Sequence, residues 1–241
     1  MDDLSEYTAL SFDVYGTLID WERGIATVLA EWSARRGETL EDEALLLAYA
    51  DNEAAVEREF PTLAYAEVLQ AAFRRTALTL GIEASDSDVQ ELGRSVPDWP
   101  AFPDTHDALV RLQRHYRLII LSNVHREGIA GSIARMGVEF DGVLTAQDIG
   151  SYKPHSRNFT VLLDSLRPLG VEQRRLLHVA QSLFHDHVPA QQAGIDSVWI
   201  NRRHDRPGWG ATPDPGVEVT PGLEFASLAA FADAVDAAFG E

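Results

Sequence analysis

The 241-residue sequence predicts an α/β protein: a doubly wound parallel sheet that carries an inserted, all-helical subdomain. Three observations favour this fold class. Short apolar segments typical of buried parallel strands recur along the chain. Helical patterns separate most of them, as expected for parallel strands joined by crossover helices. Between the first two segments lie about eighty residues with helical patterns only, which is longer than an ordinary connection.

The first expected strand, Thr8–Phe12, ends directly before Asp13 and a turn at Gly16. The other expected strands are Leu118–Leu121, Leu176–Ala180, Ser197–Ile200 and the weaker Gly142–Leu144. Core helices are expected at Ala108–His115, Phe159–Leu166, His187–Ala193 and Leu228–Phe239. Asp104 can cap the first of these helices, and Gly194 is a stop signal for the third.

The helical segment occupies residues 21–99, so the sequence predicts a core of residues 1–20 and 100–241 with the insert between its first two strands. Thr39 with Asp42, and Ser85 with Asp88, have the character of helix-start capping pairs. The proline-rich stretch PDWPAFPD, residues 97–104, predicts the return into the core. An insert at a strand end predicts a cover over an active site.

The composition excludes several classes of function. The formal net charge of −18 gives a surface that repels nucleic acid and anionic membranes. No apolar run approaches the roughly 18 residues of a membrane span, and the acidic first residues are unlike a signal peptide. The lack of cysteine excludes disulfides, thiolate metal sites and a cysteine nucleophile. These features favour a cytoplasmic enzyme, and they leave a homodimer open.

Lysine occurs once. Of the 20 basic residues, all are arginine except Lys153, in the stretch GSYKPHS. Chance is one explanation. The other is a site that needs a compact, mobile ammonium where a planar guanidinium would not fit.

Polar residues follow the predicted strands at the edge where ligands of open parallel sheets bind. They are Asp13; Ser122 and Asn123; Lys153 in the loop after Gly142–Leu144; and Gln181, Ser182 and Asp186 after Leu176–Ala180. Such convergence predicts an active site. The carboxylate of Asp13 can form an ester that water later splits, and Lys153 helps to keep it ionised. The hydroxyls of Thr17 and Ser122 can bond carboxylate or substrate oxygens.

With these residues in place, the sequence resembles the haloacid dehalogenase superfamily of hydrolases. The resemblance rests on FDVYGTL with Asp13, on Ser122 closing a strand, on Lys153-Pro154 opening a helix, and on VAQSLFHD, in the family's order. It implies a Rossmann-like core, a helical cap and an aspartate nucleophile at Asp13.

Position 15 separates two branches of this family. Its phosphatases carry a second aspartate two residues after the nucleophile, and bind Mg²⁺ with an aspartate in the fourth motif. Here Tyr15 and the pair Gln181-Ser182 occupy those places. The sequence is therefore most similar to the L-2-haloacid dehalogenases, which use no metal and no other cofactor. This resemblance implies displacement of a halide from C2 of a small carboxylic acid.

The resemblance also implies roles for individual residues. The expected catalytic residues are Asp13, Lys153, Asp186, Ser122 and Thr17, and the expected substrate contacts are Tyr15, Asn123, Gln181 and Ser182. Independently of the resemblance, the aromatic residue Trp99 is expected to contact substrate in a small apolar pocket, with ordinary core packing as the alternative. Tyr15 would form an aromatic wall, Asn123 would help to cradle the halide, and Asp186 would activate water. His185 and His187 are alternative bases, or solvent-facing histidines at a helix start.

Three features depart from the dehalogenase pattern. The cap offers no arginine at the expected place, a phenylalanine stands six residues after Lys153, and the fourth motif is AQS. A strained-ring amino acid is therefore an alternative substrate to a haloacid. A phosphatase holding Mg²⁺ with Asp13, a backbone carbonyl and Asp186 is a second hypothesis. A binding protein on a decayed hydrolase scaffold is a third.

Overall fold

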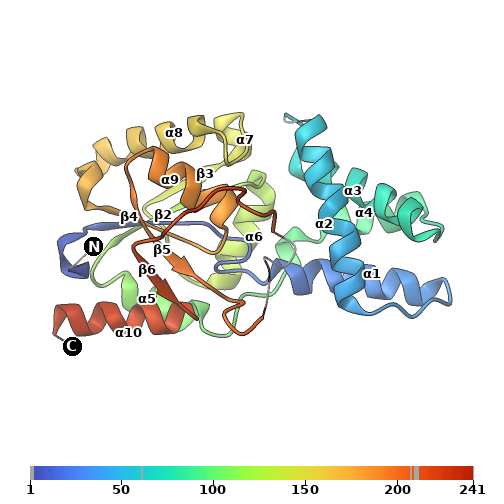
Figure 1. Cartoon of the computed structure of the whole chain (residues 1–241), viewed down its shortest axis with the longest axis horizontal. Coiled ribbons are helices and arrows are strands. Elements are labelled where there is room, and N and C mark those ends of the chain that lie inside the picture. The colour runs from blue at the N-terminus through green and yellow to red at the C-terminus, as the bar shows by residue number, and fades with distance from the viewer. Residues whose placement is uncertain (1–2, 61, 207, 209–211, 241) are drawn as a thin grey trace.

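The computed structural model describes residues 3–60, 62–206, 208 and 212–240. Within them, one parallel sheet has the strand order β3-β2-β1-β4-β5-β6 (Figure 1). The strands are β1 (Ala9–Phe12), β2 (Arg117–Ser122), β3 (Gly142–Thr145), β4 (Leu176–Ala180), β5 (Asp196–Ile200) and β6 (Leu223–Phe225). This order confirms the predicted doubly wound α/β class. It places β1 beside the point where the order reverses, which is where such sheets bind ligands.

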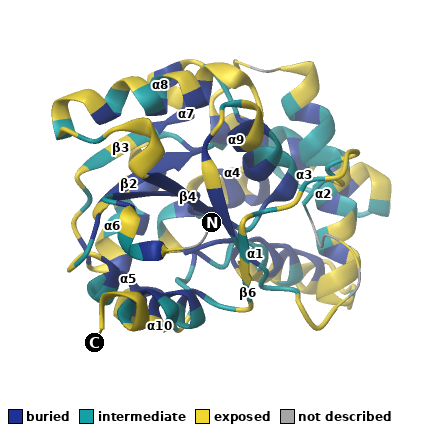
Figure 2. Cartoon of the chain, turned by 60° about the vertical axis from the view of Figure 1, so that its left-hand side comes forward, coloured by how far each residue is buried: buried dark blue, intermediate teal, exposed yellow. Residues whose placement is uncertain are grey.

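Helices cover both faces of the sheet. They are α5 (Thr105–Leu112), α6 (Arg126–Met136), α7 (Ala146–Ile149), α8 (Ser156–Leu166), α9 (Val188–Gln192) and α10 (Leu228–Phe239). Alternate strand residues divide between two clusters: Leu10 and Ile120 pack with α5, α6 and α10, whereas Ala9 and Ile119 pack with α7, α8 and α9. The central strands β1, β2 and β4 are therefore buried on both sides (Figure 2), which explains their continuous apolar runs.

A block of helices separates β1 from α5 along the chain and lies to one side of the sheet (Figure 1). Its helices are α1 (Trp21–Arg35), α2 (Asp42–Glu59), α3 (Tyr65–Leu80) and α4 (Asp86–Arg94), followed by the short 3-10 helix η2 (Val96–Asp98). The predicted helical character is thus present. The division of the chain into domains at residues 20 and 100 stays a prediction.

The capping residues predicted at helix starts agree with the structure in some places and not in others. Ser85 and Asp88 form the predicted reciprocal capping box at the start of α4. The Thr39 prediction is wrong, because α2 begins at Asp42 after Glu41 with no side-chain cap. Asp104 precedes α5 as expected but makes no capping bond, because its carboxylate instead accepts two bonds from Arg202.

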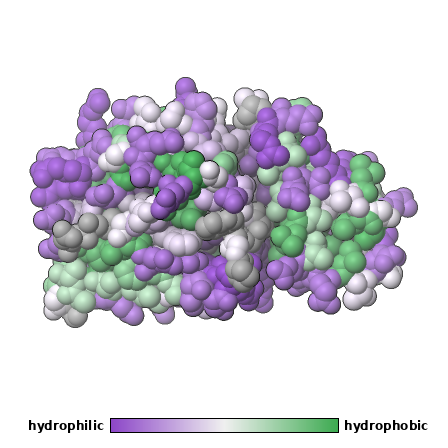
Figure 3. All heavy atoms as spheres, in the orientation of Figure 1, coloured by the Kyte–Doolittle hydropathy of each residue, from purple (hydrophilic) through white to green (hydrophobic). Residues whose placement is uncertain are grey.

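The surface is mostly hydrophilic on the face shown in Figure 3, with hydrophobic atoms gathered in a few patches. None of the helices in the described part of the chain combines the length and apolar character needed to cross a bilayer.

Candidate active site

The ammonium of Lys153, in the loop between α7 and α8, is the centre of a buried charge cluster at the carboxyl edge of the sheet. Its Nζ donates to Asp13 Oδ1 at 2.9 Å, to Asp186 Oδ1 at 2.7 Å and to the carbonyl oxygen of Leu121 at 3.0 Å. Three acceptors thus match the three donors of an ammonium. A planar guanidinium cannot point its donors in these directions, which accounts physically for a lysine at this position.

Asp13 is the first residue after β1, and the turn that follows brings Thr17 back to it. Thr17 Oγ1 donates to Asp13 Oδ2 at 2.6 Å and accepts the backbone N–H of Gln181 at 2.9 Å. Gly16 allows this turn because its φ of 96° lies in the left-handed region that side chains disfavour. Both oxygens of Asp13 are therefore held in place before any ligand binds.

Asp186 lies on a short π-helical turn, η5 (Leu183–His187), between β4 and α9. Such wide turns are rare in proteins and are frequent at functional sites. Asp186 Oδ1 accepts from Lys153 and from His178 Nε2, the latter at 3.0 Å. Its Oδ2 is buried and has no hydrogen-bond partner in the described structure. One carboxylate oxygen is thus fixed while the other is available to a ligand or to water.

His178, on β4, is a site residue that the sequence reasoning did not identify. It is fully buried, and its Nδ1 lies 2.8 Å from Ser11 Oγ while its Nε2 meets Asp186. This links Asp186 through His178 to β1. The available signal was a histidine at the centre of the apolar strand LLHVA, where an unpaired polar ring would be costly.

The local charges set the protonation states of the cluster. Burial raises the pKa of Asp13, and the charge of Lys153 counteracts this. Burial alone would also raise the pKa of Asp186, but Lys153 and His178 hold it well below its usual range. For Lys153 burial acts to lower the pKa, yet the two carboxylates raise it overall. Asp186 is therefore an anion and Lys153 a cation at neutral pH.

A cavity of about 660 Å³, including the space at its mouth, opens over this cluster. Its lining contains most of the predicted site residues, namely Asp13, Tyr15, Asn123, Lys153, Gln181, Ser182 and Asp186. The helical block contributes Trp21, Ala50, Glu53, Ala54, Glu57 and Tyr65, and further lining comes from His185, Thr212 and Pro213. The helical block and the core thus both form walls of this cavity, as the cap prediction required.

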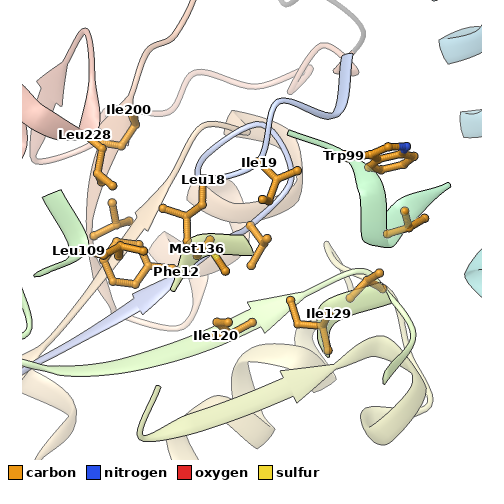
Figure 4. Close-up of a cluster of buried hydrophobic side chains, with 14 of the residues drawn as sticks. Phe12, Leu18, Ile19, Trp99, Leu109, Ile120, Ile129, Met136, Ile200 and Leu228 are labelled. Carbon is orange, nitrogen blue, oxygen red and sulfur yellow. The ribbon is translucent and has the colours of Figure 1, made fainter. Parts of the chain in front are cut away.

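Three predicted residues, Thr17, Ser122 and Trp99, lie behind the lining instead. Thr17 reaches the cavity only through Asp13, and Ser122 Oγ is buried without a hydrogen-bond partner in the described structure. Trp99 is 2% exposed and packs edge-on against Tyr15, with ring centroids 5.5 Å apart. In Figure 4 it lies apart from the side chains that pack against the sheet. It therefore supports the Tyr15 wall and does not contact the cavity, which corrects the expected substrate contact.

Asn123 and Tyr15 line the cavity with their polar atoms already engaged. Asn123 Oδ1 accepts the backbone N–H of Lys153 at 2.7 Å, and its Nδ2 donates to the Lys153 carbonyl at 3.0 Å. The Tyr15 hydroxyl lies 3.0 Å from Ser132 Oγ. Asn123 thus holds the lysine loop, and Tyr15 presents mainly its ring.

The two histidines that flank Asp186 have different surroundings. His187 is fully buried, so the solvent-facing interpretation is wrong for it, whereas His185 is half-buried. His187 meets Ser197 Oγ at 2.8 Å and the Ala180 carbonyl at 2.9 Å, so both of its ring nitrogens are used. His185 lines the cavity, and burial lowers its pKa to about 4, which leaves it neutral at pH 7.

Two carboxyl groups on α2, Glu53 and Glu57, face the cluster from the helical block. Glu53 Oε1 accepts from the hydroxyls of Tyr49 at 3.3 Å and Tyr65 at 3.1 Å. Burial raises the pKa of Glu53 to about 7 and that of Glu57 to about 8. The described cavity lining includes no arginine. Helix α2, the comparable early cap helix, thus presents acid where the dehalogenases were expected to present an arginine.

The raised pKa of Glu57 predicts a pH-dependent stability. Between its ordinary value of 4.5 and about 8, the folded protein binds more protons than the unfolded chain, so stability falls as pH rises through this window. The Glu57→Gln side chain cannot ionise. The stability of this variant minus that of the wild type is therefore expected to be larger at pH 8 than at pH 5. Urea unfolding of both proteins at the two pH values measures this. The exposed Glu43→Gln on the same helix is the control, and a difference between Glu57→Gln and wild type that does not change with pH would contradict the expectation.

Comparison with known proteins agrees with this fold. The family model of haloacid dehalogenase-like hydrolases matches residues 7–194. A search of curated protein sequences gave no match. Among solved structures, a defluorinating L-2-haloacid dehalogenase superposes with a TM-score of 0.79 at 18% identity, covering 98% of both chains.

Two other solved structures show the range of similar proteins. The L-2-haloacid dehalogenase from Xanthobacter autotrophicus, with chloropropionic acid covalently bound, has a TM-score of 0.75 at 19% identity over 95% of this chain and 98% of its own. The HAD-hydrolase YfnB from Bacillus subtilis, bound to magnesium, has a TM-score of 0.75 at 20% identity over 95% and 99%. The structural matches agree in fold, and the family model covers most of the sequence. The chain belongs to the haloacid dehalogenase-like hydrolase family.

Proposed function

We propose that this hydrolase displaces a leaving group, a halide by default, from C2 of a small carboxylic acid through an ester on Asp13. The observation that carries the proposal is the pair of carboxylates in one cavity, Asp13 and Asp186, bridged by Lys153, with Asp186 Oδ2 free of protein partners in the described structure. One carboxylate can attack carbon while the other receives a proton from water. The structurally similar L-2-haloacid dehalogenase from Xanthobacter autotrophicus was solved with chloropropionic acid covalently bound, which is a precedent for a covalent intermediate on this fold.

In the first step, a bond forms between a carboxylate oxygen of Asp13 and C2 as the bond from C2 to the halide breaks. The halide departs with the bonding electron pair, so no proton donor is needed. Tyr15 suits this step because burial raises the pKa of its phenol far above neutrality. It remains a neutral aromatic wall of the cavity and does not act as an acid.

In the second step, water attacks the carbonyl carbon of the ester on Asp13. Asp186 Oδ2 accepts one proton from that water, and this proton passes to the departing alkoxide. The second proton of the water is released to solvent when the Asp13 carboxylate re-forms. The product is the 2-hydroxy acid, and the carboxylate of Asp13 is restored. The overall balance is substrate plus water giving hydroxy acid plus hydrogen halide. The bonds from Lys153 and His178 orient Asp186 without using the oxygen that meets water.

Magnesium chemistry fits the donor set less well. Mg²⁺ prefers several hard oxygen ligands, commonly carboxylates. Here the ammonium of Lys153 bonds both Asp13 and Asp186, and the neighbouring Gln181 and Ser182 are neutral. Among the residues that the structure describes, no group of three or more acids and histidines could hold a metal ion. We therefore derive no step through a metal.

A substrate panel tests the proposal. The purified protein is assayed with 2-haloacids and with phosphate esters of small metabolites, each with Mg²⁺ and with a chelator. Halide release that persists with the chelator supports the proposal. Phosphate release that requires Mg²⁺, with no release of halide, would replace it with the phosphatase hypothesis.

The position of His178 predicts a selective defect. His178→Phe removes the bond to Asp186 Oδ1 and is expected to slow ester hydrolysis by about tenfold or more, within the range of a misplaced general base. The first step does not involve Asp186 as base and should change less. The ester should then accumulate, and a burst of halide release in rapid-quench kinetics would show it. Equal losses in both steps would contradict a positioning role.

A further inference from the structure

The helical block carries a feature that the displacement chemistry does not use. Glu53 and Glu57 lie one turn apart on α2 and line the same cavity as Asp13 and Asp186. The hydroxyls of Tyr49 and Tyr65 both donate to Glu53 Oε1, so neither of these bonds uses Glu53 Oε2. The charge of Arg58 acts to lower the pKa of Glu57, but burial and the neighbouring Glu53 raise it overall. Two carboxyl groups therefore face the cavity.

No cation on the lining can satisfy these acids. Lys153 is the cation among the described lining residues, and its three donors are committed to Asp13, Asp186 and the Leu121 carbonyl. His185 is neutral at pH 7. At pH 7 Glu57 is mostly protonated and Glu53 about half protonated, so the negative charge comes mainly from Asp13 and Asp186 against the single positive charge of Lys153. This net negative charge disfavours a purely anionic ligand.

A second observation indicates that a ligand enters this space. Asp186 is fully buried, yet its Oδ2 has no partner in the described structure and the residue lines the cavity. A buried carboxylate oxygen without a hydrogen bond is costly, and a donor brought in from outside relieves that cost. Acceptors thus lie on the helical wall and on the core wall of one cavity.

We propose that Glu53 and Glu57 bind a protonated amine of the substrate, so that the substrate is a small amino acid with the leaving group on carbon. This proposal rests on the proposed function, since it names the substrate class of the same site. An ammonium supplies donors for Glu53 Oε2 and Glu57, and its positive charge favours the ionised form of both acids, whose pKa values burial raises. Such an amino acid has one carboxylate and one ammonium, so it brings no net charge into the acidic cavity.

The test compares two acids that differ in one group. 3-Amino-2-chloropropionate carries the ammonium, and 2-chloro-3-hydroxypropionate carries a hydroxyl in its place. Chloride release gives kcat/KM for each, and calorimetry with Asp13→Asn gives binding without turnover. We expect the wild type to favour the amine by about tenfold or more, as for a hydrogen bond between charged groups. Glu53→Gln and Glu57→Gln should each reduce this preference, whereas the exposed Glu43→Gln on the same helix should keep it.

The outcomes separate this proposal from the proposed function. Glu-dependent binding of the amine without chloride release supports the ammonium site and contradicts the displacement chemistry. Chloride release from both acids with no preference for the amine supports the chemistry and overturns the ammonium site. Equal or weaker binding of the amine relative to the hydroxyl acid overturns the ammonium site whether or not turnover occurs.

Discussion

Asp13→Asn is expected to abolish turnover, with a loss of more than about 10⁴-fold in kcat, as for the removal of a catalytic nucleophile. The amide keeps the size of the side chain. Its oxygen can accept from Lys153 and its NH2 group can donate to Thr17 Oγ1, so the cavity should keep its shape. What is lost is the anionic oxygen that attacks carbon. Steady-state halide release measures the effect.

Two controls make the Asp13 result specific. The thermal unfolding midpoint of Asp13→Asn should stay close to that of the wild type, because Lys153 keeps its ion pair with Asp186. Asp13→Ala excludes slow conversion of the asparagine back to aspartate as a source of residual activity. Near-normal turnover in either variant would refute the nucleophile role.

Lys153→Arg is expected to lose at least about 10²-fold in kcat/KM, the scale of a misplaced catalytic group. The lysine is 2% exposed, and its three acceptors lie between 2.7 and 3.0 Å from one nitrogen. The larger guanidinium keeps the charge but must displace Asp13, Asp186 or the Leu121 carbonyl. Halide release at several substrate concentrations separates kcat from KM.

Lys153→Met separates charge from geometry at the same position. It keeps an unbranched side chain, removes the charge, and leaves two buried carboxylates unpaired. We expect it to be less active than Lys153→Arg and less stable, because removing one partner of a buried pair is strongly destabilising. An arginine variant with the wild-type rate would show that the single lysine of the chain is accidental.

Much of the fold could be predicted from the sequence because its strands are buried on both faces. Continuous apolar runs such as LIIL and LLHVA make such strands visible, and their observed bounds differ from the predicted ones by at most two residues. The edge strand β6 was missed, since its three residues, LEF, form no apolar run. Helix α6 was missed as well, because it mixes glycines with charged residues and its amphipathic pattern is weak.

The candidate site also has residues that could be predicted from the sequence and residues that could not. Asp13, Lys153 and Asp186 could be predicted because strand ends converge and because one lysine stands among arginines. The supporting contacts of Trp99 and Asn123 could not be predicted, since both act through packing and backbone bonds that depend on tertiary contacts. The acids of α2 can be seen in the sequence, but only the structure shows that Glu53 and Glu57 line the same cavity as Asp13.

The most direct test of the account follows oxygen through a single turnover in ¹⁸O water, with enzyme in excess over a 2-haloacid. If Asp13 forms the ester and water attacks its carbonyl carbon, the label enters the Asp13 carboxylate. The first hydroxy acid released then carries unlabelled oxygen, and mass spectrometry of the peptide and the product reads both. Label in the product, with none in Asp13, would show that water attacks the substrate directly and would contradict the account.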